Sequence, residues 1–334
     1  MKKTKKYVLL LITAIVVLAL AACGSKNDSS SNKEDSKAGA DSKTYKVGIT
    51  QIVEHPSLNE ATKGFKAALK DAGLKVEYQT EIAQGDQSVN TTAANNLVGS
   101  GADLIFANST PSAQAVAAAT SDIPIVFTSV TDAVGAELVK SMEKPGGNVT
   151  GTVDTHPEAI PDTVKFLSEQ LGAKKVGMVF NSGEQNSRVQ VDRVKKEAKN
   201  AGITIVEASA STSAEVKQAT ESLVSKVDAI YIITDNTVVS ALESVLDVAN
   251  DKKIPVIVGE LDSVARGGLG AYGFSYYDIG YEAGQKAVEI LKDGKKPADI
   301  PVAYPANLKL EINKTTADKI GVDIKEEWKA EVVK

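Results

Sequence analysis

Short polar clusters follow several apolar runs of the sequence, and they contain residue types that bind small charged molecules. Hydroxyl groups donate hydrogen bonds to an anion such as a carboxylate, and a carboxylate holds an ammonium group through a charge-assisted hydrogen bond. The clusters span residues 108–110, 128–132, 181–184, 234–237 and 259–260. These residues are therefore candidates for contact with a small ligand.

Each cluster also precedes a predicted helix, which gives these residues a second interpretation. Ser, Thr, Asp and Asn are common N-cap residues, and one such cap stabilises a helix by about 1 kcal/mol. The two roles are compatible, because the free N–H groups and the positive end of a helix attract an anion. The clusters therefore predict ligand contact, N-capping, or both.

Residue patterns of catalysis are missing from the sequence. It has no Gly-x-x-x-x-Gly-Lys-[Ser/Thr] loop, no Gly-x-Gly-x-x-Gly fingerprint after the first apolar run and no Gly-x-Ser-x-Gly elbow. One cysteine and two histidines, His55 and His156, leave mainly carboxylates as metal ligands. His55 is interpreted as a turn residue with ligand contact as the alternative, and His156 is assigned no chemistry. We expect no catalytic residue, no metal ion and no cofactor.

Length and composition indicate a globular protein of about two domains. The chain has 334 residues, of which 43% are hydrophobic and 24% charged, and a domain takes roughly 150 residues. The formal net charge is −5, and without the first 22 residues 34 basic and 43 acidic side chains remain. Such a surface repels phosphate backbones, so nucleic acid is not an expected partner.

The first 22 residues predict a secretory signal peptide. Four lysines precede an uncharged apolar stretch at 7–20, which is shorter than the roughly 20 residues of a spanning helix. Small residues then lead to Cys23, and this arrangement resembles the bacterial lipobox. The resemblance implies that the Cys23 thiol is acylated and that Cys23 becomes the mature N-terminus. The alternative is an uncleaved membrane anchor in which the cysteine occurs by chance.

Residues 23–43 are rich in Ser, Asn, Asp and Lys, and they predict a lipidated, disordered tether. Two acyl chains anchor a protein stably where one is marginal. About 20 flexible residues reach roughly 25 Å root-mean-square. The tether would therefore keep the folded part close to a membrane, with the lipid anchor as the sole membrane contact.

From residue 45 onward, short β-rich runs alternate with amphipathic helices. Continuous apolar runs between helices are typical of parallel strands in a sheet that is covered on both faces. The pattern then repeats: residues 47 and 72 match 176 and 201 at an offset of 129, and two further pairs match at 125 and 131. The repeat predicts an α/β fold of two doubly wound parallel-sheet lobes with the same topology.

The late part of the chain predicts segments that cross back and forth between the lobes. The first would lie near 148–155, and an aromatic cluster of Tyr272, Phe274, Tyr276 and Tyr277 marks the second. We interpret this cluster as hinge and core packing, except that Tyr272 is a candidate wall of the ligand site. We assign 44–150 with 276–304 to lobe 1, and 151–275 with 305–334 to lobe 2.

The lipobox, the tether, the duplicated lobes and three segments together resemble ABC transporter substrate-binding lipoproteins. The segments are Val47-Gly48-Ile49, Ala107-Asn108-Ser109-Thr110 and Pro124-Ile125-Val126-Phe127-Thr128. The most similar branch is the tryptophan/tyrosine-type proteins of Gram-positive bacteria. The resemblance implies the type I periplasmic-binding-protein fold with three crossover segments, hinge closure, and delivery of ligand to a permease with a cytoplasmic ATPase. It also implies a lipid-anchored monomer on the extracellular face of the cell membrane.

The expected ligand is an aromatic amino acid, namely tryptophan, tyrosine or phenylalanine. Branched-chain amino acids, sugars, nucleosides and a sensing role without transport stay open as alternatives. Ser109, Thr110, Ser129 and Thr131 are expected to hold the carboxylate, and Asp235 the ammonium group. The full set of candidate ligand-binding residues is Gln51, His55, Ser109, Thr110, Ser129, Thr131, Asn181, Glu184, Thr234, Asp235, Asn236, Glu260 and Tyr272.

Overall fold

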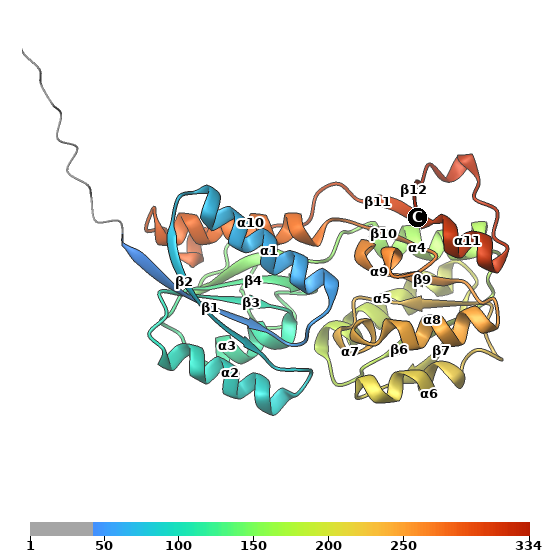
Figure 1. Cartoon of the computed structure of the whole chain (residues 1–334), viewed down its shortest axis with the longest axis horizontal. Coiled ribbons are helices and arrows are strands. Elements are labelled where there is room, and N and C mark those ends of the chain that lie inside the picture. The colour runs from blue at the N-terminus through green and yellow to red at the C-terminus, as the bar shows by residue number, and fades with distance from the viewer. Residues whose placement is uncertain (1–42) are drawn as a thin grey trace, which may run out of the picture. The chain divides into compact units, whose positions relative to one another are not determined.

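The computed structural model of the protein describes residues 43–334, which form two α/β lobes (Figure 1). The predicted signal peptide, the lipidation site Cys23 and all of the predicted tether except Lys43 lie outside the described residues. Within residues 43–334, none of the helices combines the length and the apolar character needed to cross a membrane.

The first lobe is built on a five-stranded sheet in the order β2-β1-β3-β4-β5, with every pair of neighbours parallel. Its strands are β1 (Thr44–Gln51), β2 (Lys75–Ile82), β3 (Leu104–Asn108), β4 (Ile125–Val130) and β5 (Val149–Val153). All residues of β3, β4 and β5 are buried. Helices cover both faces of this sheet, which is why these strands do not alternate between apolar and polar residues.

The helices α1 (Pro56–Asp71) and α10 (Tyr276–Leu291) pack together on one face of the first sheet, and α2 (Gln87–Gly99) and α3 (Thr110–Ala119) cover the other. The backbones of α1 and α10 are in close contact, since a Cβ on Gly280 would lie 1.9 Å from the Ala61 carbonyl oxygen. Beneath them Phe65 stacks on Phe106 of β3 at 3.9 Å between ring centroids, and Ala283 of α10 belongs to the same buried cluster. A helix from the last quarter of the chain thus completes the core of the first lobe.

The second lobe is built on a seven-stranded sheet in the order β12-β11-β10-β9-β8-β6-β7. Its strands are β6 (Lys175–Phe180), β7 (Thr204–Ser209), β8 (Ala229–Ile232), β9 (Val256–Val258), β10 (Gly270–Gly273), β11 (Lys309–Asn313) and β12 (Glu331–Val333). The pair β10–β11 is antiparallel, whereas the sequence predicted parallel sheets throughout. The chain leaves this lobe after β10 and returns directly into β11, so the two strands meet the lobe boundary at the same end and run in opposite directions.

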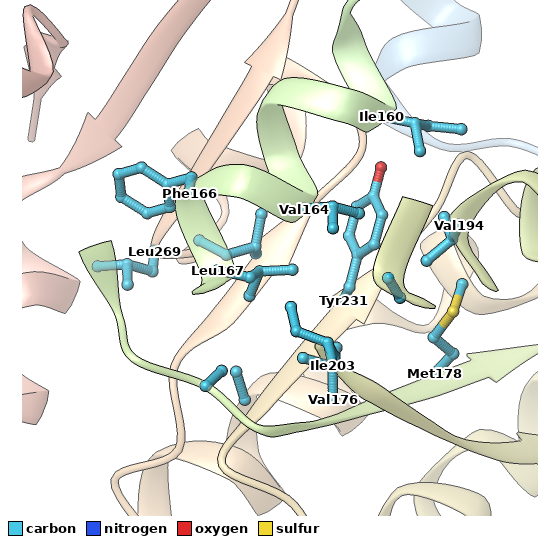
Figure 2. Close-up of a cluster of buried hydrophobic side chains, with 14 of the residues drawn as sticks. Ile160, Val164, Phe166, Leu167, Val176, Met178, Val194, Ile203, Tyr231 and Leu269 are labelled. Atoms are coloured by element: carbon cyan, nitrogen blue, oxygen red, sulfur yellow. The ribbon is translucent and has the colours of Figure 1, made fainter. Parts of the chain in front are cut away.

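The helices of the second lobe are mostly short. They are α4 (Ala159–Lys165) with the π-helical turn η1 (Phe166–Gln170), α5 (Gln185–Asn200), α6 (Val216–Glu221), α7 (Asn236–Ser240), α8 (Leu242–Asp251), α9 (Leu261–Ala265) and α11 (Lys314–Ile320). Single 3₁₀ turns occur at η2 (Ser213–Glu215), η3 (Pro297–Asp299) and η4 (Glu326–Trp328). Figure 2 shows part of the core of this lobe, where Tyr231 of β8 lies among Val164 of α4, Leu167 of η1 and Ile203.

The two sheets repeat one strand order, because β2-β1-β3-β4 in the first corresponds to β7-β6-β8-β9 in the second. The four pairs of segments matched in the sequence lie on these four pairs of strands. The predicted fold of two α/β lobes with the same topology is confirmed, apart from the antiparallel pair described above.

Three segments connect the lobes. The first follows β5, which stays paired with β4 as far as Val153, so the crossing begins a few residues later than the boundary predicted at 150. The second joins β10 to α10, and the third runs from Ala303, which bridges Thr152 of the first sheet, to β11. Figure 1 shows all three in the upper part of the view, between the two sheets.

Candidate functional site

A cavity of about 310 Å³ lies between the two lobes. The first lobe contributes the residues that follow β4 and β5, the second lobe contributes α4, α5 and the end of β8, and the crossing segments complete the wall. Most of the lining is apolar, and ligand sites in proteins commonly have this character and a volume of about 300–1,000 Å³. We refer to it as the large cavity.

Asp154 is the carboxylate at the polar end of the large cavity. It directly follows β5 and is 8% exposed. Its Oδ1 accepts a hydrogen bond from Thr131 Oγ1 at 3.1 Å, and its Oδ2 accepts one from the Tyr276 hydroxyl at 2.8 Å. Burial raises the pKa of Asp154, and these two hydrogen bonds oppose the rise. No ion pair of residues 43–334 includes Asp154, so its charge is available for a cationic ligand group.

Gln190 of α5 connects the lobes beside this carboxylate. Its Oε1 accepts hydrogen bonds from Thr234 Oγ1 at 3.0 Å and from the Thr234 backbone N–H at 3.3 Å. Its Nε2 donates to Thr131 Oγ1 of the first lobe at 3.4 Å. The lobes therefore touch at the cavity through uncharged groups, and Asp154 is not neutralised by this contact.

Aromatic and aliphatic side chains form the apolar wall of the large cavity. Phe274 stacks on Tyr276 with ring centroids 5.9 Å apart, and Val153 and Ile160 line the cavity from opposite lobes. Tyr231 lines it as well, and burial raises the pKa of this phenol to about 12. The wall suits an apolar, planar side chain, for which stacking adds to the gain from burial.

A small cavity of about 10 Å³ adjoins the large one and shares Asp154 and Thr234 with it. His55 and Ser129 line it from the first lobe, and Glu260 lines it from the second. Burial and the nearby Arg266 together lower the pKa of His55 to about 3, so the imidazole is neutral. Glu260 caps α9 by accepting hydrogen bonds from the Ser263 N–H at 2.9 Å and from its hydroxyl, and burial raises its pKa.

A third cavity of about 220 Å³ also lies between the lobes. Asp86 of the first lobe and Glu184 of the second line it, together with Asn236. Glu184 is almost fully buried and accepts hydrogen bonds from Asn236 Nδ2 at 2.6 Å and from Thr237 Oγ1 at 3.0 Å. Its carboxylate oxygens thus serve to hold the α5 and α7 starts together.

Residues 46–333 match the family of ABC transporter substrate binding proteins. The chain belongs to this family. The family's members bind substrates for transport, so the chain is a binding protein and not an enzyme. Over 323 residues, which are 95% of this chain and 92% of the relative, it is 43% identical to the tyrosine-binding protein of Clostridioides difficile (strain R20291).

Two solved structures of substrate-binding relatives resemble this one to different degrees. An ABC domain from Streptococcus pneumonia in complex with L-Trp is 34% identical, with a TM-score of 0.82 over 87% of this chain and 100% of that chain. A ligand-free, open substrate-binding protein with adhesive properties from Clostridium difficile is 40% identical, yet its TM-score is 0.65 over 87% and 99%. This structure therefore superposes better on the ligand complex than on the ligand-free, open protein.

The fold extends to more distant proteins. A glucose-galactose binding protein from Geobacillus stearothermophilus is 17% identical, with a TM-score of 0.61 over 80% of this chain and 97% of that chain. This likeness shows only that the two proteins share the two-lobe fold of type I periplasmic binding proteins.

Of the thirteen candidate residues, seven line one of the three cavities of this binding protein. Thr131 and Thr234 line the large cavity, and Glu184 lines the third. The small cavity has the most of them, namely His55, Ser129, Thr234, Asn236 and Glu260. The other six, which are Gln51, Ser109, Thr110, Asn181, Asp235 and Tyr272, line none of these cavities.

Asp235 does not have the surroundings of an ammonium acceptor, which corrects the expectation from the sequence. It is fully buried, and its Oδ1 accepts from the Val238 N–H at 2.8 Å as the N-cap of α7. Its Oδ2 accepts from the Asn181 N–H and from Ser187 Oγ, both at 2.6 Å. Burial and the neighbouring Glu184 raise the pKa of Asp235 to about 7. The donors of its own lobe already occupy this carboxylate.

Ser109 and Thr110 are also used inside their own lobe. Ser109 is the N-cap of α3 and accepts from the Ser112 N–H at 3.4 Å, and Thr110 Oγ1 accepts from the Thr131 N–H at 3.4 Å. The remaining three side chains have local contacts: Gln51 donates to the Val53 carbonyl, Asn181 accepts from the Gly183 N–H, and Tyr272 packs edge-on against Phe166. These residues position the site or stabilise the core without reaching the large cavity.

Sequence reasoning missed the residues that define the large cavity. Asp154 follows the apolar run 149–153, a signal of the same kind as the predicted clusters, but the run was assigned to a crossing segment. Phe274 belongs to the aromatic cluster that the sequence analysis interprets as packing, and so does Tyr276, which lines the small cavity and donates to Asp154. Gln190 lies inside α5, where a single polar residue gives no signal that it faces a cavity.

Proposed function

We propose that this protein binds an aromatic amino acid, tyrosine or tryptophan, in the large cavity and delivers it to the permease of an ABC importer. The tyrosine-binding relative at 43% identity and the relative that was solved with L-Trp support this ligand class. The better superposition of this structure on the L-Trp complex than on the ligand-free, open relative supports binding between closed lobes.

The main support for the proposal is Asp154, a buried carboxylate that has no basic partner among residues 43–334 and faces an apolar, aromatic cavity between the lobes. The ammonium group of the ligand would bind Asp154, and its ring would lie against Phe274, Ile160 and Val153. A charge-assisted hydrogen bond in a desolvated cleft contributes about 1.5–3 kcal/mol, so this contact would select amino acids over neutral solutes.

Arg193 is a basic side chain in the lining of the large cavity. It lines the large cavity from α5, one helical turn after Gln190, and donates to the Pro157 carbonyl of the first crossing segment. A guanidinium group has five N–H donors, so Arg193 retains donors for the ligand carboxylate. Ammonium and carboxylate would then contact different lobes, and bound ligand would stabilise the closed state.

We also propose that the protein is anchored on the extracellular face of the cell membrane through an acylated Cys23. The basic start, the apolar stretch and the lipobox-like residues before Cys23 support this location. Metabolic labelling with a radioactive fatty acid tests it. The wild type should become labelled and stay with the membrane fraction, whereas Cys23→Ala should remain unlabelled.

Isothermal titration calorimetry of the purified protein tests the ligand. Tyrosine and tryptophan should bind, phenylalanine should bind more weakly or equally, and leucine and glucose should bind at least tenfold more weakly. Binding of glucose or a nucleoside in preference to the aromatic amino acids would refute the assignment. Formation of a new product from the ligand would contradict the non-enzymatic role.

Asp154→Asn tests the role of the carboxylate. The substitution keeps the shape and removes the charge, so the affinity for tyrosine should fall about 100-fold, which corresponds to about 3 kcal/mol. Asp132→Asn is the matched control, because Asp132 lines the same cavity and accepts a hydrogen bond from the Gly135 N–H at 2.8 Å. Equal losses in both variants would mean that Asp154 has no specific contact with the ligand.

A further inference from the structure

Five side-chain polar atoms of the first lobe are buried without a hydrogen-bond partner among residues 43–334, and two of them, His55 Nδ1 and Ser129 Oγ, belong to residues that line the small cavity. The two side chains are 7% and 6% exposed. Nearly all buried polar atoms in folded proteins have a partner, and an unpaired one often marks the position of a bound water or ion. Both atoms therefore need an explanation.

Both residues line the small cavity, and residues of the opposite lobe face them. Thr234, Asn236 and Glu260 line it from the second lobe, and Asp154 and Tyr276 close it at the crossing segments. The small cavity has a volume of about 10 Å³, which is about what one water molecule needs. The cavity is thus polar, shared by both lobes and too small for an organic molecule.

The hydrogen-bonding groups around the small cavity are complementary to a molecule with both donors and acceptors. Burial keeps the His55 ring neutral, and a neutral imidazole has one N–H donor and one acceptor nitrogen. Nδ1 of His55 has no hydrogen-bond partner among residues 43–334, and it is an acceptor when the ring proton is on Nε2. Ser129 contributes a hydroxyl donor, and Glu260 contributes carboxylate oxygens.

The backbone conformation of Ser129 also supports a binding site in the small cavity. Its φ angle is 56°, a left-handed conformation that residues other than glycine adopt infrequently. Such conformations persist where the surrounding structure requires them, and they cluster at functional sites. Here the conformation coincides with a serine hydroxyl that lines the small cavity without a protein partner.

We propose that the small cavity binds a single water molecule that links the two lobes in the closed state. The water donates hydrogen bonds to His55 Nδ1 and to the Glu260 carboxylate, and it accepts one from Ser129 Oγ. Three hydrogen bonds are the usual number for a buried water, and a bridging water is nearly as favourable as a direct contact.

The water site would be coupled to ligand binding, and in this respect the inference rests on the proposed function. Its groups come from both lobes, so the site exists only while the lobes are closed. It shares Asp154 and Thr234 with the large cavity, which puts the water next to the proposed ammonium position. Loss of the water should therefore weaken ligand binding without changing which ligand is bound.

A high-resolution crystal structure of the wild-type protein with tyrosine or tryptophan is the direct test. The expected result is one fully occupied water within 3.2 Å of His55 Nδ1 and Ser129 Oγ, a distance typical of hydrogen bonds. An empty small cavity, an atom of the amino acid in it, or a metal ion in it would each overturn the proposal. If neither amino acid binds, the proposed function fails, and the same density in a closed crystal form still decides the water site.

Calorimetry of Ser129→Ala measures the contribution of the water. The affinity for tyrosine should fall about fivefold, which corresponds to about 1 kcal/mol, and the crystal structure of the variant should show a weaker or missing water. Thr50→Val is the matched control, because Thr50 Oγ1 is equally buried and unpaired among the described residues but lines none of the three cavities. An unchanged affinity for Ser129→Ala, or an equal loss in Thr50→Val, would contradict the proposal. The wild-type crystal structure remains decisive if Ser129→Ala does not fold.

Discussion

Asp154 and Asp235 are two buried carboxylates that follow β-strands, and their surroundings differ in kind. Burial raises the pKa of both. Asp235 accepts two backbone N–H hydrogen bonds and one hydroxyl, all from the second lobe. Asp154 accepts two hydroxyls, from Thr131 and Tyr276, and it lines the large cavity.

The difference follows from what comes next in the chain. Asp235 is followed at once by α7, whose free N–H groups require an acceptor, and the carboxylate becomes its N-cap. Asp154 is followed by an extended crossing segment, and the next helix starts only at Ala159. An acidic residue at a strand end is therefore free to bind a ligand when no helix begins directly after it.

Replacement of Asp235 by alanine should show the largest effect on stability. Two backbone N–H groups and a hydroxyl lose their acceptor inside the core, so the free energy of unfolding should fall by about 3 kcal/mol, measured by chemical denaturation. The affinity of the folded protein for tyrosine should stay within threefold of the wild type. A large loss of affinity with full stability would reverse the roles of the two carboxylates.

Asp228→Ala is the matched control for Asp235. Asp228 precedes β8 and also accepts two backbone N–H hydrogen bonds, from Lys174 and Lys175, each at 2.8 Å, but it lies at the surface. Water can replace the hydrogen bonds that Asp228 accepts, so Asp228→Ala should lower the free energy of unfolding by about 1 kcal/mol or less. Similar costs in the two variants would show that burial of the Asp235 cluster is unimportant.

The pH dependence of stability should distinguish the surroundings of Asp154 from those of Asp235. His55, beside Asp154 in the small cavity, has a pKa of about 3 in the folded protein and about 6.5 when unfolded. The pKa of His55 is lower in the folded protein than in the unfolded protein. Neutral His55 therefore makes its full contribution to the free energy of unfolding above pH 6.5, and this contribution is lost as the pH falls toward 3. Between pH 7.5 and 5.5 the free energy of unfolding should drop by about 1.4 kcal/mol on this account.

His55→Gln isolates this contribution. Asp154 and Glu260 have raised pKa values and titrate in the opposite sense, but both are present in the variant and the wild type. The difference between the two unfolding curves as a function of pH therefore reports His55 alone. Parallel curves between pH 7.5 and 5.5 would mean that His55 does not stay neutral in the folded protein.

The smallest predicted effect concerns two aromatic residues at the end of the second lobe. Phe274 lines the large cavity, whereas Tyr272, two residues earlier, packs on Phe166 in the core. Phe274→Leu keeps an apolar side chain but removes the ring, so the affinity for tyrosine should fall about fivefold, since an aromatic pair adds about 1 kcal/mol. Tyr272→Leu should leave the affinity unchanged in the same calorimetric titration.

The fold could be predicted from the sequence because its signals are local and repeated. Buried parallel strands such as Leu104–Asn108 appear as continuous apolar runs, and duplication of the lobes gives each strand a counterpart at nearly constant spacing. The direction of β11 could not be predicted in this way, because it depends on where the chain re-enters the second lobe.

The site was less predictable, because polar residues occur at strand ends both as ligand contacts and as helix caps. Ser109 and Asp235 have the composition and position of ligand contacts but serve as helix caps. Asp154 and Tyr276 come from crossing segments that are 122 residues apart in the chain, and only the folded hinge brings them into contact. A single sequence contains no signal for such a pair.

The packing of α10 on α1 has a consequence for the order in which the protein folds. One face of the first sheet is covered by α10, which ends at Leu291. Gly280 of this helix contacts Ala61 so closely that no larger residue fits at position 280. During synthesis, which starts at the N-terminus, nearly all residues must therefore have been added before the first lobe can become compact. A truncation at residue 275 should consequently yield an aggregation-prone fragment rather than an isolated folded half.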